Sequence, residues 1–230
     1  MPMLIRSKTL AAGFLLLGAG MLSPPLSLDA QTAAVADADA VRTLEAAAER
    51  YRSLEAICSE FRQVVRNEIL GETIRSRGEL CQRVDRFEMR FTDPEGDRIV
   101  ADGTHLWIYL PSTDPGQVFR TSPSEVGGRF DLHSEFLTDP GVRYAPRIEG
   151  ETEIEGRAVT LLRLNPVGPS PFVTARLWVD DADRLIRRVE ITEDEGFVRT
   201  LDLTGIRLNP TIPGERFRFE VPPGVQVIPT

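Results

Sequence analysis

The sequence has few of the side chains that enzymes use for chemistry. It contains two histidines, His105 and His133, and neither lies in a metal-ligand or catalytic-triad context. It also lacks a glycine-rich phosphate loop and a nucleophile elbow. Asp180, Asp181 and Asp183 do not have the spacing of a calcium loop and are better explained as turn residues. We therefore predict no enzymatic activity, no catalytic residue, no bound metal and no cofactor.

Basic tracts and late apolar runs are also missing. Beyond residue 30 the chain carries 25 basic and 34 acidic side chains, a net charge of −9. An acidic chain without a basic tract binds nucleic acid and anionic membrane surfaces poorly. No apolar run after residue 22 is long enough to span a bilayer. These absences predict that the chain has no nucleic-acid partner and does not bind anionic membrane surfaces.

The first thirty residues have the pattern of a secretory signal peptide. Arg6 and Lys8 precede the apolar core "LAAGFLLLGAGML", and the small residue Ala30 follows it. An uncleaved anchor is the alternative, and the apolar run is short for one. Cleavage is expected after Ala30, and Ala34, Ala36 and Ala38 are the alternative positions. We expect a signal peptide over 1–30, a flexible segment over 31–38 and a single domain over 39–230, with no cysteine placed to accept a lipid.

Only two cysteines are present, Cys58 and Cys81. Their midpoint falls in the predicted turn "ILGET", so a hairpin of 61–69 with 74–84 brings the thiols together near its open end. An oxidising compartment favours a disulfide between them, the alternative being two buried thiols. Without a second pair of ligands they do not indicate a metal site.

The remaining pattern predicts one helix followed by many strands. Apolar residues recur every three or four positions over 39–57, with Asp39 as the expected cap. Short turns connect the strands, so we expect an antiparallel, twisted sheet of about eleven strands with the helix in its concave face. Segment 122–141 has a loose helical pattern ended by Pro140-Gly141. The expected strands are 61–69, 73–83, 86–92, 97–101, 105–110, 117–121, 142–149, 158–165, 173–180, 184–192, 197–208, 216–220 and 225–228.

The stretch "VADGTHLWIYLP" is apolar on both faces of its predicted strand. Asp102-Gly103 predicts the preceding turn, Leu106 and Ile108 point to one side, and Trp107 and Tyr109 point to the other. Both faces of this strand are therefore expected to be covered, the inner one by the helix. A set of apolar residues shares that inner face, and periodicity alone leaves open whether it fills a core or lines a cavity: Phe87, Met89, Phe91, Ile99, Leu106, Ile108 and Phe119.

In order along the chain, several motifs resemble the periplasmic outer-membrane lipoprotein carrier family, LolA. They are "FRQVV", "GEL", "RVDRFEMRFTDPEGDRIVADGTHLWIYLP" and "FRFEVPPGVQVI". Two positions depart from the family pattern: Val84 stands where a proline follows the arginine, and Cys81 replaces a tryptophan.

The resemblance implies a mainly β fold, an unclosed antiparallel half-barrel with an N-terminal helix and a helical lid over an apolar cavity. It implies that acylated lipoproteins are taken from an inner-membrane ATP-driven release complex and passed to an outer-membrane receptor. The cavity residues would be the apolar set named above. Arg83 would be the lid latch, with its guanidinium hydrogen-bonded to lid backbone carbonyls. Such a carrier is expected to be a monomer in the periplasm.

Three other interpretations compete with the carrier. A periplasmic sensor of stray lipoproteins uses the same half-barrel, but sensors of that type carry a further domain where this chain stops at Thr230. A lipid-anchored receptor needs the missing lipidation cysteine. A secreted hydrolase needs a nucleophile–base pair, and the sequence offers none.

Overall fold

A single large sheet organises the part of the chain that the structure describes, which comprises residues 37–83, 85–122 and 135–229 of a computed structural model. All of these residues fall within one compact unit, Ala34–Thr230. The strands are β1 (Ala56–Asn67), β2 (Glu72–Arg83), β3 (Arg86–Asp93), β4 (Glu95–Ala101), β5 (Leu106–Tyr109), β6 (Gln117–Thr121), β7 (Tyr144–Ile154), β8 (Arg157–Pro166), β9 (Thr174–Asp180), β10 (Ile186–Thr192), β11 (Phe197–Leu208) and β12 (Gln226–Pro229). The helical elements are α1 (Ala38–Arg52), α3 (Pro140–Arg143) and the 3-10 turn η1 (Gly214–Phe217).

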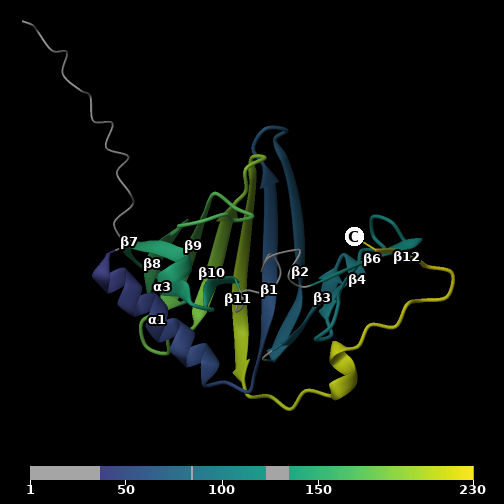
Figure 1. Ribbon diagram of the computed structural model, residues 1–230, viewed down its shortest axis with the longest axis horizontal. Helices are drawn as coiled ribbons and strands as arrows, with labels where there is room; N and C mark the ends of the chain where they lie inside the picture. Colours follow the sequence, from purple (N-terminus) through teal and green to yellow (C-terminus); the bar gives the residue numbers. More distant parts are fainter. Residues whose placement is uncertain (1–36, 84, 123–134, 230) are drawn as a thin grey trace, which may run out of the picture. The chain divides into compact units, whose positions relative to one another are not determined.

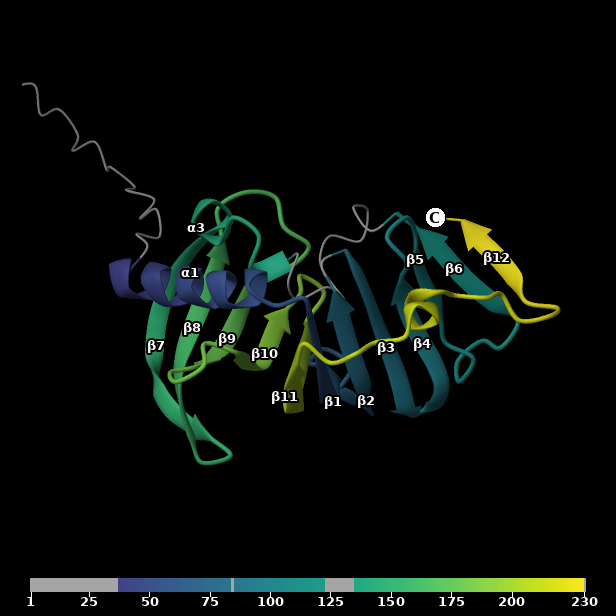
Figure 2. The same cartoon turned by 90° about the horizontal axis from the view of Figure 1, so that it is seen from below.

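The strand order is β12-β6-β5-β4-β3-β2-β1-β11-β10-β9-β8-β7, and the sheet does not close on itself (Figure 1). Neighbouring strands pair antiparallel from β6 to β7, as the short turns predicted. The pairing at the far edge is different, because β12 runs parallel to β6. The tail after β11 brings β12 to this edge, because it passes from the middle of the sheet to the edge formed by β6 (Figure 2).

Helix α1 is shorter than its apolar periodicity predicted. It begins after Asp37, whose side chain accepts the Asp39 N–H at 2.8 Å, so the cap is Asp37 and not Asp39. It ends at Arg52, and β1 already begins at Ala56. The helix contacts β7, β9 and α3 rather than β5 (Figures 1 and 2). The prediction that the helix covers the inner face of 105–110 was therefore wrong.

Two further expectations about elements are corrected. The segment 216–220 is not a strand, because η1 occupies its first two positions and the chain then continues without a ladder. Pro140 does not end a helix but begins α3, since proline is accepted in the first turn of a helix. Segment 122–141, for which the sequence left open a lid helix or a surface loop, falls largely on residues 123–134, which lie outside the described residues, as do His133, Val84 and the predicted signal peptide.

The turn between β4 and β5 also differs in register by one residue. The Asp102 N–H donates to the His105 carbonyl at 3.0 Å, which makes Gly103 and Thr104 the two loop residues. Gly103 has a φ of 93°, as a primed hairpin turn requires. The Asp102 carboxylate accepts the N–H groups of Thr104 and His105, each at 2.8 Å, and thereby fixes the turn.

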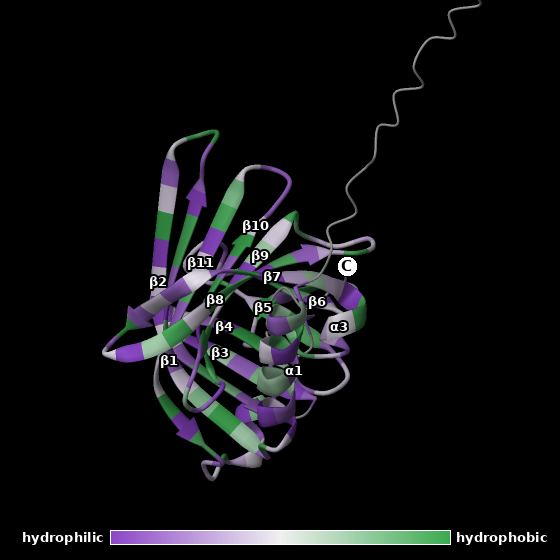
Figure 3. Cartoon of the chain, turned by 90° about the vertical axis from the view of Figure 1, so that its left-hand side faces the viewer, coloured by the Kyte–Doolittle hydropathy of each residue, from purple (hydrophilic) through white to green (hydrophobic). Residues whose placement is uncertain are grey.

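The two faces of the sheet have different roles. We call the face that packs with α1 the inner face and its opposite the outer face. Hydrophobic and hydrophilic segments alternate along the strands (Figure 3), as expected when successive side chains point to opposite faces. Within the described residues, no helix has the length and apolar character needed to cross a bilayer.

Candidate functional site

The inner face carries one continuous apolar cluster. It joins α1 through Ala40, Leu44 and Ala48 to side chains of the strands from β5 across the sheet to β7. Five of the seven predicted cavity residues are buried in this cluster, namely Phe87, Met89, Phe91, Ile99 and Leu106. A sixth, Ile108, is half-buried and packs against it. The sequence therefore identified the apolar centre of the inner face. In the described residues this centre is packed side chain against side chain.

Strand register explains why these residues meet. Met89 lies directly opposite Leu80 on β2 and Ile99 on β4, and Phe87 lies opposite Ala101. Each partner occupies the same face, so apolar side chains form rows across the sheet. Phe91 meets the Phe61 ring edge-on, with the ring centroids 5.1 Å apart. The alternation of β3 thus converts three apolar residues into the middle row of the cluster.

Gly78 makes room for that row. It lies opposite Phe91, and a Cβ at this position would come within 2.0 Å of the Arg90 carbonyl oxygen. The backbones of β2 and β3 therefore approach each other more closely than any side chain at position 78 would permit. This is the glycine of the "GEL" motif.

Phe119 differs from the other predicted cavity residues. It pairs with Ile108, so it lies on the inner face, but it is 41% exposed and is not part of the cluster. Inner-face side chains are therefore buried at the centre of the sheet and become exposed near the edge formed by β6 and β12. The outer face of β5 is covered instead by the tail, where Trp107 stacks on Phe219 at 5.3 Å.

An open pocket lies where α1 ends and β1 begins. It measures about 130 Å³, and Tyr51, Leu54, Ile57, Gln82 and Arg83 are among its lining residues. Burial raises the pKa of Tyr51 to about 12, although its hydroxyl accepts the Ile186 N–H at 3.2 Å. An apolar cavity of about 150 Å³ is large enough for benzene, and ligand pockets generally begin near 300 Å³. In this conformation the pocket does not have room for an acyl chain.

Arg83, the predicted latch, lines this pocket at the last position of β2. Its side chain is exposed, and the hydrogen bonds and ion pairs found among the described residues do not include it. By alternation Gln82 points to the inner face, where it is buried opposite Phe87 and Ile57. The structure places Arg83 at the pocket mouth, and its latch role stays a prediction.

Glu135, Arg143 and Tyr144 form a hydrogen-bonded cluster beside β7, which we call the clamp and which the sequence did not indicate. The Arg143 guanidinium donates to the Glu135 backbone carbonyl at 2.5 Å and to its carboxylate at 2.7 Å. The Tyr144 hydroxyl donates to the same carbonyl and carboxylate at 2.9 and 2.6 Å. Burial and the neighbouring carboxylate raise the pKa of Tyr144 well above its usual range. The clamp holds the residues after position 134 against β7.

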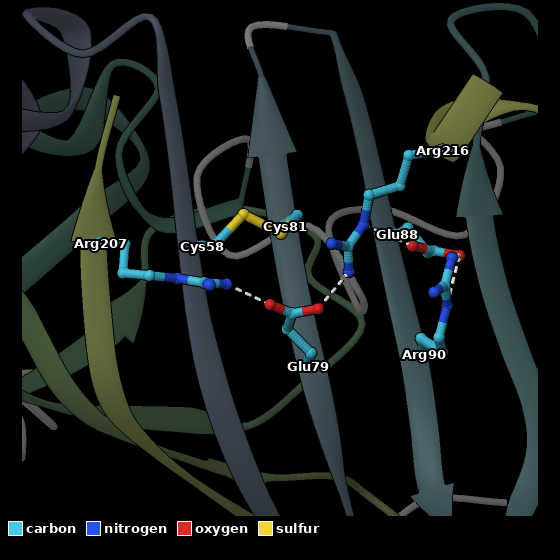
Figure 4. Close-up of a disulfide and its surroundings, with 7 residues drawn as sticks. All are labelled: Cys58, Glu79, Cys81, Glu88, Arg90, Arg207 and Arg216. Atoms are coloured by element: carbon cyan, nitrogen blue, oxygen red, sulfur yellow. Dashed lines mark hydrogen bonds and ion pairs between the residues drawn. A yellow bond between two sulfur atoms is a disulfide. The ribbon is translucent and has the colours of Figure 1, made fainter. Parts of the chain in front are cut away.

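On the outer face, Cys58 and Cys81 form the predicted disulfide (Figure 4). They lie directly opposite each other in the β1–β2 ladder, as the hairpin predicted. Phe217 of η1 and Ile212 pack against them. The tail is thereby brought onto the outer face of the sheet.

An arginine–glutamate network continues from the disulfide (Figure 4). Glu88 is completely buried and accepts from Arg98 at 2.6 Å, Arg90 at 3.1 Å and Arg216 at 2.7 Å. Arg216 also reaches Glu79 at 2.6 Å. Burial alone would raise the pKa of Glu79, but hydrogen bonds from Arg216 and Arg207 lower it overall. Arg216 therefore ties the tail to both β2 and β3.

Comparison with known sequences finds relatives that carry the same name. Several proteins named outer-membrane lipoprotein carrier protein match the chain, among them those of three bacteria. The one from Halorhodospira halophila is 33% identical over 156 residues, covering 63% of this chain and 65% of the relative. The one from Aeromonas salmonicida is 24% identical, covering 74% and 80%, and the one from Chromobacterium violaceum is 27% identical, covering 88% and 93%. The chain thus spans slightly less than two thirds of the Halorhodospira relative. No protein-family model matches the chain.

Comparison with solved structures supports the fold. An uncharacterized conserved protein from Thermus thermophilus aligns with a TM-score of 0.54 at 16% identity, covering 84% of this chain and 99% of that one. MucB aligns with a TM-score of 0.52 at 19% identity, covering 80% and 64%. At these identities the likeness concerns the fold alone. The predicted unclosed half-barrel with an N-terminal helix and the predicted resemblance are both confirmed.

Proposed function

We propose that this chain, a homologue of the outer-membrane lipoprotein carrier proteins, is a periplasmic carrier that holds the acyl chains of lipoproteins and has no enzymatic role. The observation that carries the proposal is the aromatic and aliphatic cluster on the inner face of an unclosed sheet. Acylated lipoproteins would be its cargo. An inner-membrane ATP-driven release complex and an outer-membrane receptor would be the donor and the acceptor, and the carrier would act as a monomer.

The energetics require that cargo and protein side chains compete for the same space. Burying one methylene gains about 0.8 kcal/mol, so one long acyl chain gains on the order of 10 kcal/mol. A preformed cavity that captured all of this free energy would hold its cargo too tightly for release. Because the inner face is packed without cargo, separating Phe87, Met89 and their neighbours would offset part of the gain.

The pocket at the end of α1 is the proposed entry point. It is already open, and its lining includes Gln82, which lies opposite Phe87, and Ile57, which lies opposite Gln82. Widening this pocket would expose the cluster without breaking strand pairing. Arg83 at its rim is the proposed latch, and Phe87, Met89, Phe91, Ile99, Leu106, Ile108 and Phe119 are the proposed cargo contacts.

The sensing alternative has weaker support. The likeness to MucB is a likeness of fold at 19% identity, whereas the named carriers reach 33% identity. We therefore propose carriage and use the sensing role as a contrasting outcome of the test.

The test is acyl binding by the purified chain. We expect lipoprotein to co-purify with the protein from a periplasmic extract and a fluorescent fatty-acyl probe to compete for the same site. Phe87→Glu should abolish binding, because a carboxylate in the cluster is strongly penalised. Val221→Glu, at an exposed tail position, is the matched control. Ile108→Asn serves as a milder second variant if Phe87→Glu does not fold.

The latch is tested by transfer. Arg83→Leu should load cargo and fail to deliver it to outer-membrane vesicles, whereas Arg86→Leu, at the first position of β3, should deliver normally. Normal transfer by Arg83→Leu would remove the latch from the proposal. Cargo binding followed by activation of a regulator, without any transfer, would support sensing instead of carriage.

A further inference from the structure

The turn of the β1–β2 hairpin exposes three large aliphatic side chains. Ile69, Leu70 and Ile74 are 75%, 66% and 65% exposed, although they lie within six residues of one another. The hairpin reaches farther from the centre of the sheet than its neighbours (Figure 1). Single exposed aliphatic residues are common on soluble proteins, whereas contiguous exposed apolar residues are typical of interaction sites.

A groove adjoins these residues. It has a volume of about 490 Å³ and is lined by Val65, Pro171 and Phe197 together with Glu193, Asp194 and Glu195. The Glu68 N–H donates to the Gly196 carbonyl at 2.9 Å, and the Ile69 side chain lies against Gly196. The hairpin turn and the groove are therefore one surface, which we call the tip surface.

The backbone of the turn is firmly held. The Asn67 side chain accepts the N–H groups of Ile69 and Leu70, each at 3.0 Å. Gly71 adopts a φ of 70°, and its N–H donates to the Asn67 carbonyl at 2.8 Å. The aliphatic side chains are thus presented outward by an ordered turn, so a partner would not have to order this backbone on binding.

Strand alternation places the apolar residues near the turn on the inner face. Val65 lies opposite Ile74 on β2 and Arg199 on β11. All three share the inner face, and Arg66 and Arg75 project from the outer face. The inner face near the hairpin turn therefore presents Val65 and Ile74 with one arginine, Arg199, whereas Arg66 and Arg75 lie on the other side.

The charge of the groove is negative. Glu193, Asp194 and Glu195 contribute three carboxylates, and the Arg199 guanidinium lies 3.6 Å from Glu193. A negative rim repels an anionic lipid surface and attracts cations. We propose that the tip surface docks a segment of a partner protein in which aliphatic or aromatic side chains lie next to arginine or lysine.

Site-specific photo-crosslinking tests this proposal on the full chain in its periplasm. Benzoylphenylalanine replaces Leu70 in one protein and Val142, which is 78% exposed on α3, in the matched control. We expect position 70 to give about tenfold more protein crosslink than position 142, because the photo-reactive ring labels only groups that it contacts and Val142 lies outside the tip surface. Sequencing the crosslinked peptide should reveal the apolar and basic composition stated above.

Charge reversal provides the second arm. Asp194→Lys/Glu195→Lys should reduce the crosslink at position 70 by about tenfold, since attraction becomes repulsion. Glu151→Lys/Glu153→Lys on β7 is the control and should leave it unchanged. Crosslinking only to lipid, only to a second copy of the chain, or to an acidic segment would overturn the proposal, as would equal yields at positions 70 and 142.

The proposal stands independently of cargo binding. Ile69→Ser/Leu70→Ser/Ile74→Ser should bind the fatty-acyl probe like the unmodified protein, because the cluster on the inner face is untouched. Failure of probe binding in the unmodified protein would count against carriage, and loss of the position-70 crosslink alone would count against docking.

Discussion

Arg143 donates hydrogen bonds to two oxygens of Glu135, the backbone carbonyl at 2.5 Å and a carboxylate oxygen at 2.7 Å. A guanidinium on a backbone carbonyl is the geometry expected of Arg83, and the structure shows it at Arg143 instead. The Glu135 side chain is almost fully buried, and its second oxygen has no hydrogen-bond partner among the described residues. Arg143 is therefore the main compensation for a carboxylate in the interior.

Removing that guanidinium should destabilise the fold. Arg143→Ala leaves a buried carboxylate with Tyr144 as its remaining side-chain donor, and we expect a loss of about 2 kcal/mol in the free energy of unfolding. Urea denaturation measures it. Arg147→Ala, an exposed arginine on the neighbouring strand β7, should change the value by less than about 0.5 kcal/mol. Equal losses in both variants would contradict the clamp.

Breaking the disulfide should also cost stability. Cys58 and Cys81 are 23 residues apart, and a crosslink closing a loop of this size contributes about 2–4 kcal/mol. Cys58→Ser/Cys81→Ser should therefore unfold at lower urea concentration than the oxidised protein. Reductant should lower the midpoint of the unmodified protein and leave that of the double variant unchanged. A midpoint insensitive to reductant would show that the crosslink contributes little.

Acid should weaken the turn between β9 and β10. Burial alone would raise the pKa of Asp180, but hydrogen bonds from Arg157, the Ala182 and Asp183 N–H groups and Arg187 hold it well below its ordinary value of 3.8. The folded-state pKa is thus depressed, so the stabilisation is complete above about pH 4 and is lost as the pH falls through the folded pKa.

Asp180→Asn isolates this effect. The variant should be less stable than the unmodified protein at pH 7, and the difference should shrink as the pH falls below about 4. Asp194→Asn, in an exposed turn, is the control and should change the free energy of unfolding at pH 7 by less than about 0.5 kcal/mol. Parallel curves for Asp180→Asn and the unmodified protein down to about pH 2 would contradict the assignment.

Adding one methyl group at Gly78 should separate two strands. The new Cβ would overlap the Arg90 carbonyl oxygen, so Gly78→Ala should cost about 3 kcal/mol or more in the free energy of unfolding. Gly150→Ala on β7 meets nothing within 4 Å and is the control. If both variants unfold alike, the close approach of β2 and β3 is not a constraint.

Local alternation made much of the site predictable. The residues of β3 that face inward were identified because Arg86, Glu88 and Arg90 separate them. The disulfide followed from the midpoint of two cysteines about a turn. Phe119 fits the same alternation but is exposed, because pairing register determines which face a residue occupies and not how deeply that face is covered.

Long-range partners were less predictable. The Glu135–Arg143 clamp joins residues whose local pattern resembles an ordinary turn, so nothing in the sequence marks Glu135 as buried. The parallel pairing of β12 depends on where the tail arrives after crossing the sheet. Helix α1 ends early because Ile57, which continues the helical periodicity, pairs instead with β2 and β11 as part of β1.

The two edges of the open sheet have a consequence for solubility. An unclosed sheet offers unpaired backbone groups that could recruit strands from other molecules and begin aggregation. On β7 the Pro146 carbonyl accepts the Asp37 N–H, the ladder shifts between Ile148 and Gly150, and acidic side chains follow. On the other edge β12 is short and ends at Pro229. Both borders thus discourage the growth of fibres, which permits an open architecture to persist at high concentration.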